Sequence, residues 1–257
     1  MRVLLSNDDG VHAAGLRALA AAFSGDEVWV VAPDREQSAS SHAISLHRPL
    51  RMAEVQPRWY AVDGTPTDAV YMGICLVLKH ARPDVVVSGI NHGPNLGNDV
   101  HYSGTVAAAI EGALLGVPAA AISLAASPPH DFEHAARFAA ALVRRMMVPP
   151  ANGASPAPLL LNVNVPPGPV RGFTVTRLGR RTYGNEVVEK TDPRGRKYYW
   201  IGGEGGARNE DIPGSDCNAV KAGLAAVTPL HLDPTHDPAL ARLQDLAVPG
   251  YEKERSP

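Results

Sequence analysis

Apolar runs and amphipathic repeats alternate along much of the chain. Continuous apolar stretches predict buried β-strands at residues 3–5, 27–32, 84–88, 117–123 and 159–165. Between them, apolar side chains recur at helical spacing, which predicts helices at residues 16–23, 66–80, 105–115 and 131–147. Strands that are apolar on both faces and alternate with helices are typical of a parallel sheet covered on both sides. The pattern therefore predicts an α/β fold with a doubly wound, mostly parallel sheet.

The pattern changes in the last third of the chain. Residues 171–206 carry short β-type runs around a turn at residues 191–195, which predicts antiparallel hairpins. A further strand is expected at residues 222–230 and a short last helix at residues 238–246. Residues 148–158 are rich in proline, glycine and alanine and are expected to form a linker.

We expect these elements to form one domain over residues 1–257. Its core sheet would come from residues 1–147 and 159–166, and residues 171–257 would add a hairpin, a strand and a C-terminal helix as an extension. The predicted hairpin carries three consecutive aromatic residues at 198–200. An exposed aromatic hairpin needs a partner, and a second subunit is the simplest one.

The charge balance gives the chain no general attraction to polyanions. The 257 residues include 24 lysines and arginines against 26 acids, so neither duplex nucleic acid nor a membrane is an expected partner. The longest apolar stretch, 114–126, contains Gly116 and Pro118 and is shorter than a membrane span. We find no secretory signal at the start, and Cys75 and Cys217 are too few for a disulfide framework. A cytoplasmic location is therefore expected.

Two adjacent acids stand where the first predicted strand ends. The apolar run Val3–Leu5 is followed, after one serine, by Asn7, Asp8, Asp9 and Gly10. Carboxylates held together in a tight turn repel each other unless a cation lies between them. Ligands of open α/β sheets bind beyond the carboxyl ends of the strands, which makes this turn the expected place for a hard metal ion. These four residues alone fit an ordinary polar turn equally well.

Further oxygen donors reach the same edge of the predicted sheet. Ser38 follows the second strand and Asn91 follows the third. With Asp8 and Asp9 they supply two carboxylates, a hydroxyl and an amide carbonyl, a set that suits Mg²⁺, Mn²⁺ or Ca²⁺ and not zinc. The histidines in this part of the chain are His42, His92 and His101. None has the paired spacing of a zinc site.

The start of the predicted helix at residues 105–115 offers a place for an anion. Ser103, Gly104 and Thr105 stand there, and the glycine lets a ligand approach the backbone. Free N–H groups and the positive end of the helix dipole attract anions. An isolated Ser-Gly-Thr is usually an ordinary N-cap, but beside a metal-type cluster it indicates a phosphate cradle. The dinucleotide fingerprint and the Walker lysine motif are both missing from the sequence.

A divalent cation beside a phosphate cradle indicates phosphoryl transfer to water. A phosphatase of the haloacid dehalogenase type needs two acids separated by one residue, whereas Asp8 and Asp9 are adjacent. A receiver-type signalling module needs an aspartate at the end of a later strand, where Ser88 and Gly89 stand. A metal- and nucleotide-binding sensor without turnover remains as the alternative.

Seven motifs follow one another along the chain. They are Asn7–Gly10, Pro33–Ser38, Gly64–Asp68, Ser88–Asn91, Tyr102–Thr105, Asn162–Pro166 and Val227–Leu230. In this order they resemble the stationary-phase survival protein (SurE) family, over residues 1–231. The resemblance implies a Rossmann-like, three-layer α/β/α fold and a metal-dependent 5'-nucleotidase that acts on nucleoside monophosphates, with some members cleaving other phosphate esters or polyphosphate. It also implies a homodimer or homotetramer formed through the C-terminal extension.

The resemblance also assigns site residues by position. The implied metal ligands, for one divalent ion per subunit, are Asp8, Asp9, Ser38 and Asn91. The expected catalytic residues are Asp8, Asp9 and Asn91. The expected phosphate-binding residues are Asn7, Ser103, Gly104 and Thr105. Three positions depart from the family pattern: His92 stands in place of arginine, Asn98 in place of an acid and His101 in place of an aliphatic residue, which bears on substrate preference. The neighbouring Asp99 is expected to order, through hydrogen bonds, the glycine-rich loop between the strand predicted at 84–88 and the helix predicted at 105–115.

Overall fold

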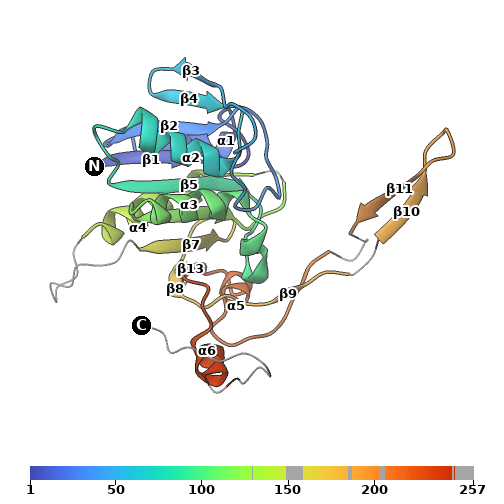
Figure 1. Ribbon diagram of the computed structural model, residues 1–257. Helices are drawn as coiled ribbons and strands as arrows, with labels where there is room; N and C mark the ends of the chain where they lie inside the picture. The colour runs from blue at the N-terminus through green and yellow to red at the C-terminus, as the bar shows by residue number, and fades with distance from the viewer. Residues whose placement is uncertain (129, 149–158, 185–186, 203–205, 245, 247–257) are drawn as a thin grey trace.

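The computed structural model has a nine-stranded sheet with helices on both faces (Figure 1). It describes residues 1–257 except 129, 149–158, 185–186, 203–205, 245 and 247–257. From edge to edge the strands are β3 (Met52–Gln56), β4 (Trp59–Val62), β2 (Glu27–Pro33), β1 (Arg2–Ser6), β5 (Val85–His92), β6 (Ala119–Leu124), β7 (Leu160–Val165), β13 (Ala225–Pro229) and β8 (Phe173–Val175). Neighbouring strands are parallel except in the pairs β3–β4 and β7–β13.

The helices and the smaller sheets complete the described structure. The helices are α1 (Ala14–Ala22), α2 (Pro66–Met72), the π-helix η1 (Gly73–Val77), the 3-10 helix η2 (Gly97–His101), α3 (Gly104–Leu114), α4 (Glu133–Met146), α5 (Asp216–Lys221) and α6 (Asp237–Leu243). The two small antiparallel pairs are β9 (Arg181–Thr182) with β12 (Arg208–Asn209) and β10 (Val187–Thr191) with β11 (Lys197–Ile201). Among the described helices, none combines the length and apolar character that a membrane crossing requires.

Strand β1 lies in the middle of the sheet, between β2 and β5, and is buried on both faces. Successive side chains of a strand point to opposite faces. Val3 and Leu5 accordingly pack into the core beneath α1 and α4, whereas Leu4 packs into the core beneath α2 and α3. The predicted doubly wound, three-layer α/β/α fold is confirmed. The residues that follow β1 therefore emerge at the centre of the carboxyl edge of the sheet.

Some elements differ from the sequence-based prediction. The helix expected at residues 66–80 is α-helical only to Met72 and continues as the π-helix η1. Within residues 171–206, the predicted hairpin is β10–β11, but β8 instead joins the main sheet, parallel to β13. β8 has only three residues and is largely exposed, so its sequence carries no strand pattern long enough to recognise.

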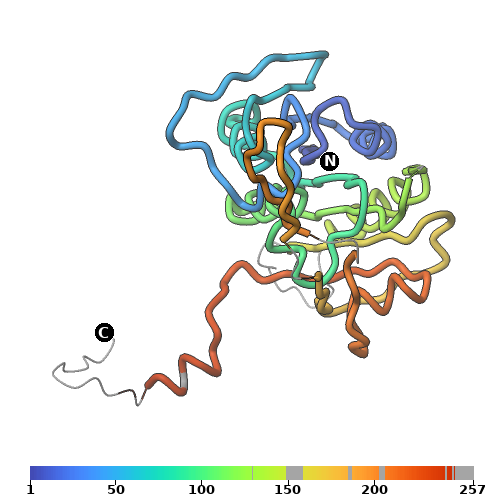
Figure 2. Tube along the Cα trace, turned by 90° about the vertical axis from the view of Figure 1, so that its right-hand side faces the viewer, coloured from blue at the N-terminus to red at the C-terminus, as the bar shows by residue number. Residues whose placement is uncertain are grey.

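Two further differences concern the end of the chain. Helix α5, which begins after the N-cap residue Ser215, was not predicted. The last helix is present as α6, which lies away from the sheet in Figure 2. Of the predicted linker at 148–158, only Val148 lies within the described residues.

Asp216 ties the C-terminal half of the chain to the loop that follows β5. Its buried carboxylate accepts hydrogen bonds from the backbone N–H groups of Gly97 at 2.9 Å, Gly179 at 2.7 Å and Cys217 at 2.8 Å. Three N–H donors satisfy a buried carboxylate well. This one side chain therefore joins segments that lie more than a hundred residues apart in the sequence, since Gly97 and Asp216 are separated by 119 positions.

We expect Asp216→Ala to lower the free energy of unfolding by about 3 kcal/mol or more, because two buried N–H groups from other segments lose their acceptor. Chemical denaturation measures this change. Asp211→Ala, which removes an exposed carboxylate hydrogen-bonded to Asn218, is the matched control and should cost less than about 1 kcal/mol. Equal effects of the two variants would contradict the role given to Asp216.

Candidate active site

The turn after β1 holds its two acids in a fixed arrangement. The side-chain amide of Asn7 donates a hydrogen bond to the carbonyl of Gly10 at 2.9 Å. Gly10 has a φ of +98°, and an added Cβ would lie 3.2 Å from the backbone of Arg35, so glycine is required there. The carbonyl of Asp8 accepts the N–H of Gln37 at 2.7 Å. The loops after β1 and β2 are therefore joined beside Asp8 and Asp9.

The N-terminus of α3 packs directly against Asp8. Thr105 donates its hydroxyl hydrogen to Asp8 Oδ1 at 2.5 Å. A Cβ on Gly104 would lie 2.8 Å from the Cβ of Asp8 and 2.9 Å from Ser40 Oγ, so only glycine allows this approach. Ser103 is the N-cap, and its hydroxyl accepts the N–H of Val106 at 3.1 Å. The helix start and the acidic turn thus form one packed unit.

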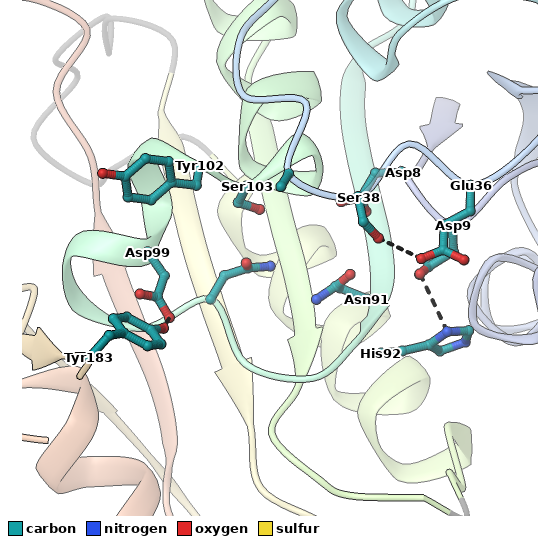
Figure 3. A pocket seen from close by; sticks show the side chains of 12 residues that line it. Asp8, Asp9, Glu36, Ser38, Asn91, His92, Asp99, Tyr102, Ser103 and Tyr183 are labelled. Carbon is teal, nitrogen blue, oxygen red and sulfur yellow. Dashed lines mark hydrogen bonds and ion pairs between the residues drawn. The ribbon is translucent and has the colours of Figure 1, made fainter. Parts of the chain in front are cut away.

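A cavity of about 330 Å³ opens above this unit. Its described lining is Asp8, Asp9, Glu36, Ser38, Ala39, Asn91, His92, Asn95, Asp99, Tyr102, Ser103 and Tyr183 (Figure 3). Four of these residues are carboxylic acids, and none is lysine or arginine. An anionic substrate therefore meets a lining whose charge repels it unless a cation is present.

Burial and mutual repulsion disfavour the charged forms of the two acids. Burial raises the pKa of Asp8, even though Thr105 donates to its carboxylate. Burial, and then the charge of Asp8, raise the pKa of Asp9 to about 7. Asp9 Oδ1 lies 3.3 Å from Nδ1 of His92, whose ring stacks on that of His130 with centroids 5.2 Å apart. The other oxygen of Asp9 is buried without a hydrogen-bond partner among the described residues.

The neutral oxygens of Ser38 and Asn91 complete the acidic end of the cavity. The side-chain amide group of Asn91 donates to the carbonyl of Gly93 at 2.9 Å, which leaves its oxygen facing Ser38 and Asp8 in Figure 3. The Ser38 hydroxyl donates to Glu36 at 2.6 Å, so its lone pairs stay available.

These groups fit a hard divalent cation. Mg²⁺, Mn²⁺ and Ca²⁺ prefer oxygen donors of the kinds found here. They are the unpartnered oxygen of Asp9, the carboxylate of Asp8 and the neutral oxygens of Ser38 and Asn91. The described residues contain no group of three or more histidines, cysteines, aspartates or glutamates arranged to hold a metal ion. Neutral oxygens therefore have to supply part of any coordination shell.

The loop after β5 is held by side chains from β6 and β7. Asn164 accepts the backbone N–H of Asn95 at 2.8 Å, and Asn162 and Asn164 donate to the Asn95 carbonyl at 2.8 and 3.0 Å. The Asn95 side chain donates to Ser123 Oγ at 2.8 Å. The two asparagines of β7 thus secure the loop that runs from the end of β5, beside Asn91, to Ser103.

The predicted site residues gather around this cavity in two groups. Those that line it are Asp8, Asp9, Ser38, Asn91 and Ser103. Those that lie buried behind the lining are Asn7, Gly104 and Thr105. Of the three histidines singled out in the sequence, only His92 is in the described lining. His42 instead pairs with Glu111 at 2.9 Å, and the carbonyl of His101 accepts the hydroxyl of Ser41 at 2.7 Å.

Sequence reasoning missed part of the cavity wall. Asp99 accepts the hydroxyl of Tyr183 at 2.7 Å and pairs with the Arg181 guanidinium. It therefore joins η2 to the segment after β9, rather than only ordering its own loop. Tyr102, Tyr183 and Glu36 also line the cavity. Glu36 could have been noted as an acid two residues before Ser38, whereas no local signal marks Tyr183.

Comparisons with known proteins identify the family of this chain. A family model described as survival protein SurE matches residues 3–185. The 5'-nucleotidase SurE of Anaeromyxobacter dehalogenans (strain 2CP-C) is 80% identical, over 100% of both chains, and that of Myxococcus xanthus (strain DK1622) is 58% identical, over 98% of this chain and 95% of the other. The crystal structure of the SurE protein from Aquifex aeolicus superposes with a TM-score of 0.82 at 38% identity and covers 95% of this chain and 98% of that one. The chain therefore belongs to the SurE family of 5'-nucleotidases, enzymes that hydrolyse nucleoside monophosphates.

Proposed function

We propose that this 5'-nucleotidase depends on one divalent ion per subunit, Mg²⁺ or Mn²⁺, bound by Asp8, Asp9, Ser38 and Asn91. The observation that carries the proposal is the charge of the cavity: its described lining has four carboxylates and no lysine or arginine, yet the substrate is an anion. A divalent cation bound between Asp8 and Asp9 offsets that repulsion and attracts the phosphate. The alternative of a sensor without turnover is set aside, because the relatives are nucleotidases.

Residues of the chain hold the reacting groups in place. Asn7 fixes the acidic turn through Gly10, and Thr105 orients Asp8 by donating to Oδ1. The N-terminus of α3 at Ser103 directs the positive end of its dipole to the cavity, where it favours the negative charge of the phosphoryl group. When bound, a divalent ion supplies positive charge to the phosphoryl oxygens and Lewis acidity toward the attacking water.

We further propose that the hairpin β10–β11 forms subunit contacts in a homodimer or homotetramer. The hairpin extends away from the sheet in Figure 1. It exposes Val187, Tyr199, Trp200 and Ile201, with Trp200 62% and Ile201 94% exposed. Apolar and aromatic side chains gathered on a projecting ribbon are typical of a protein interface.

We also propose a cytoplasmic location. The support is that Cys75 is exposed and Cys217 is buried, each as a free thiol, which suits a reducing compartment.

The metal dependence is tested by phosphate release from AMP. We expect activity to disappear after exhaustive EDTA treatment and to return when Mg²⁺ or Mn²⁺ is added, because the bound ion offsets the charge of Asp8 and Asp9 and attracts the phosphate. Titration calorimetry on the EDTA-treated protein should give one Mn²⁺ per subunit, and Ca²⁺ is tested beside it. Equal rates of phosphate release before and after EDTA treatment would contradict the proposal.

The role of the acid pair is tested by Asp8→Asn. The variant loses one of two anionic ligands but also loses the repulsion with Asp9, so activity should collapse while the metal-free variant melts no lower than metal-free wild type. Mn²⁺ at a hundredfold excess over its dissociation constant should stabilise wild type by about 2.7 kcal/mol and the variant much less.

Thermal melts with EDTA and with Mn²⁺, run beside the phosphate assay, measure these effects. Asp34→Asn is the control, because this exposed acid stands at the end of the neighbouring strand β2 and outside the described lining. An Asp8→Asn protein that keeps both its turnover and its stabilisation by Mn²⁺ would contradict the metal-binding role and would show that residues 7–10 form an ordinary polar turn.

The hairpin contact is tested by sedimentation. We expect wild type to be a dimer or tetramer at micromolar concentration and the double variant Trp200→Ser, Ile201→Ser to form a smaller species, because it loses exposed apolar surface. Leu76→Ser removes an exposed apolar side chain from η1 and should leave the assembly unchanged. A monomeric wild type would show that the hairpin has another use.

A further inference from the structure

The cavity has an aromatic end as well as an acidic one. Tyr102 and Tyr183 both line it, and 66% and 50% of their surfaces are exposed. In Figure 3 the two rings lie on the opposite side of Ser103 and Asn91 from Asp9, with Asp99 between them. Apart from these rings, Ala39 is the only apolar residue of the described lining. The cavity therefore divides into a charged end and an end that offers aromatic faces.

The position of Tyr183 is fixed by polar contacts. Its hydroxyl donates to Asp99 at 2.7 Å, and the guanidinium of Arg181 lies 5.6 Å from the ring centroid. The backbone N–H of Arg181 donates to Asn98 Oδ1 at 2.7 Å, which ties the segment to η2. Burial, and then the hydrogen bond to Asp99, raise the pKa of Tyr183 to about 12, so the hydroxyl keeps its proton near neutral pH. The ring is therefore held in place before any ligand arrives.

The position of Tyr102 is also fixed by contacts to η2. It follows η2 directly, and its N–H donates to the carbonyl of Asp99 at 2.9 Å. Its carbonyl accepts the N–H of Ser41 at 3.2 Å, so its backbone is fixed from two sides while the ring stays in the open. The next residue is Ser103, the N-cap of α3, which also lines the cavity. An exposed ring that sits one residue from the proposed phosphate cradle is well placed to touch the rest of a nucleotide.

We propose that Tyr102 and Tyr183 form the nucleoside end of the cavity and that the nucleobase of the substrate stacks on their rings. This inference rests on the proposed function, which places the phosphate at Asp8, Asp9 and Ser103. Stacking on an aromatic face is open to every base, because each base has a π-face. The one carboxylate nearby, Asp99, is already paired with Arg181 and Tyr183. We therefore expect the site to favour nucleotides over small phosphate esters but not to discriminate between the bases.

The inference gives the C-terminal extension a second use. Tyr183 belongs to the segment after β9, far along the chain from the acids of β1. The extension thus supplies part of the substrate cavity itself, besides the hairpin that we assign to subunit contacts.

The test compares two phosphate esters that differ in the base. Steady-state kinetics with Mn²⁺ are measured on AMP and on ribose 5-phosphate for wild type, Tyr102→Ala and Tyr183→Ala. We expect each alanine variant to lose roughly tenfold or more in kcat/KM on AMP, mainly through KM, because stacking is lost. On ribose 5-phosphate the same variants should stay within about twofold of wild type, since that ester has no base to stack.

Conservative variants separate stacking from structural support. Tyr102→Phe keeps the ring and should match wild type on AMP. Tyr183→Phe keeps the ring but loses the bond to Asp99, so it should fall between wild type and Tyr183→Ala. Tyr71→Ala removes an exposed tyrosine of α2 that is outside the described lining, and it should leave both substrates unaffected.

Equal losses on AMP and ribose 5-phosphate would overturn the inference, since the rings would then support the reacting end rather than the base. Unchanged kinetics of both alanine variants on AMP would overturn it as well. A wild type that hydrolyses neither ester in a metal-dependent way would instead contradict the proposed function, and this inference with it.

Discussion

Repulsion between two adjacent carboxylates, one buried and one partly buried, is the constraint on which the rest of the structure depends. Asp8 and Asp9 stand at the centre of the carboxyl edge of the sheet, because β1 is a central strand. Burial raises the pKa of both groups, so the fold holds them together at a cost in stability. Gly10 and Gly104 permit the close packing, and Thr105 satisfies one oxygen. A turn built in this way is explained by a cation that the two acids share.

The other side of the cavity depends on contacts between distant parts of the chain. Strand β5 carries Asn91, and the loop after it leads to Ser103 and is anchored by Asn164 on β7 and Asp216 on α5. Asp99 then adds Tyr183 to the wall. The N-terminal half thus supplies most of the cavity lining, and the C-terminal half anchors the loop before α3 and adds Tyr183.

The sequence predicted the charged end of the site because that end follows from local pattern. Asp8 and Asp9 follow the buried strand β1, and parallel strands bring Ser38 and Asn91 to the same edge. The aromatic end could not be predicted in this way. Tyr183 reaches the cavity through its own bond to Asp99, across 84 positions, and through the contacts of Arg181 with Asn98 and Asp99, none of which leaves a periodic signal. The short elements β8 and α5 could not be predicted for a related reason, because three and six residues are too few to show a periodic pattern.

The central claim is that Asp8 and Asp9 share one divalent ion with Ser38 and Asn91. Anomalous diffraction at the manganese absorption edge, from crystals grown with Mn²⁺, tests it most directly because it locates the ion itself. The account predicts one strong peak per subunit within coordination distance of both carboxylates, of the Ser38 hydroxyl and of the Asn91 amide oxygen. A peak elsewhere in the cavity, for example beside Asp99, with none at Asp8 and Asp9, would contradict it.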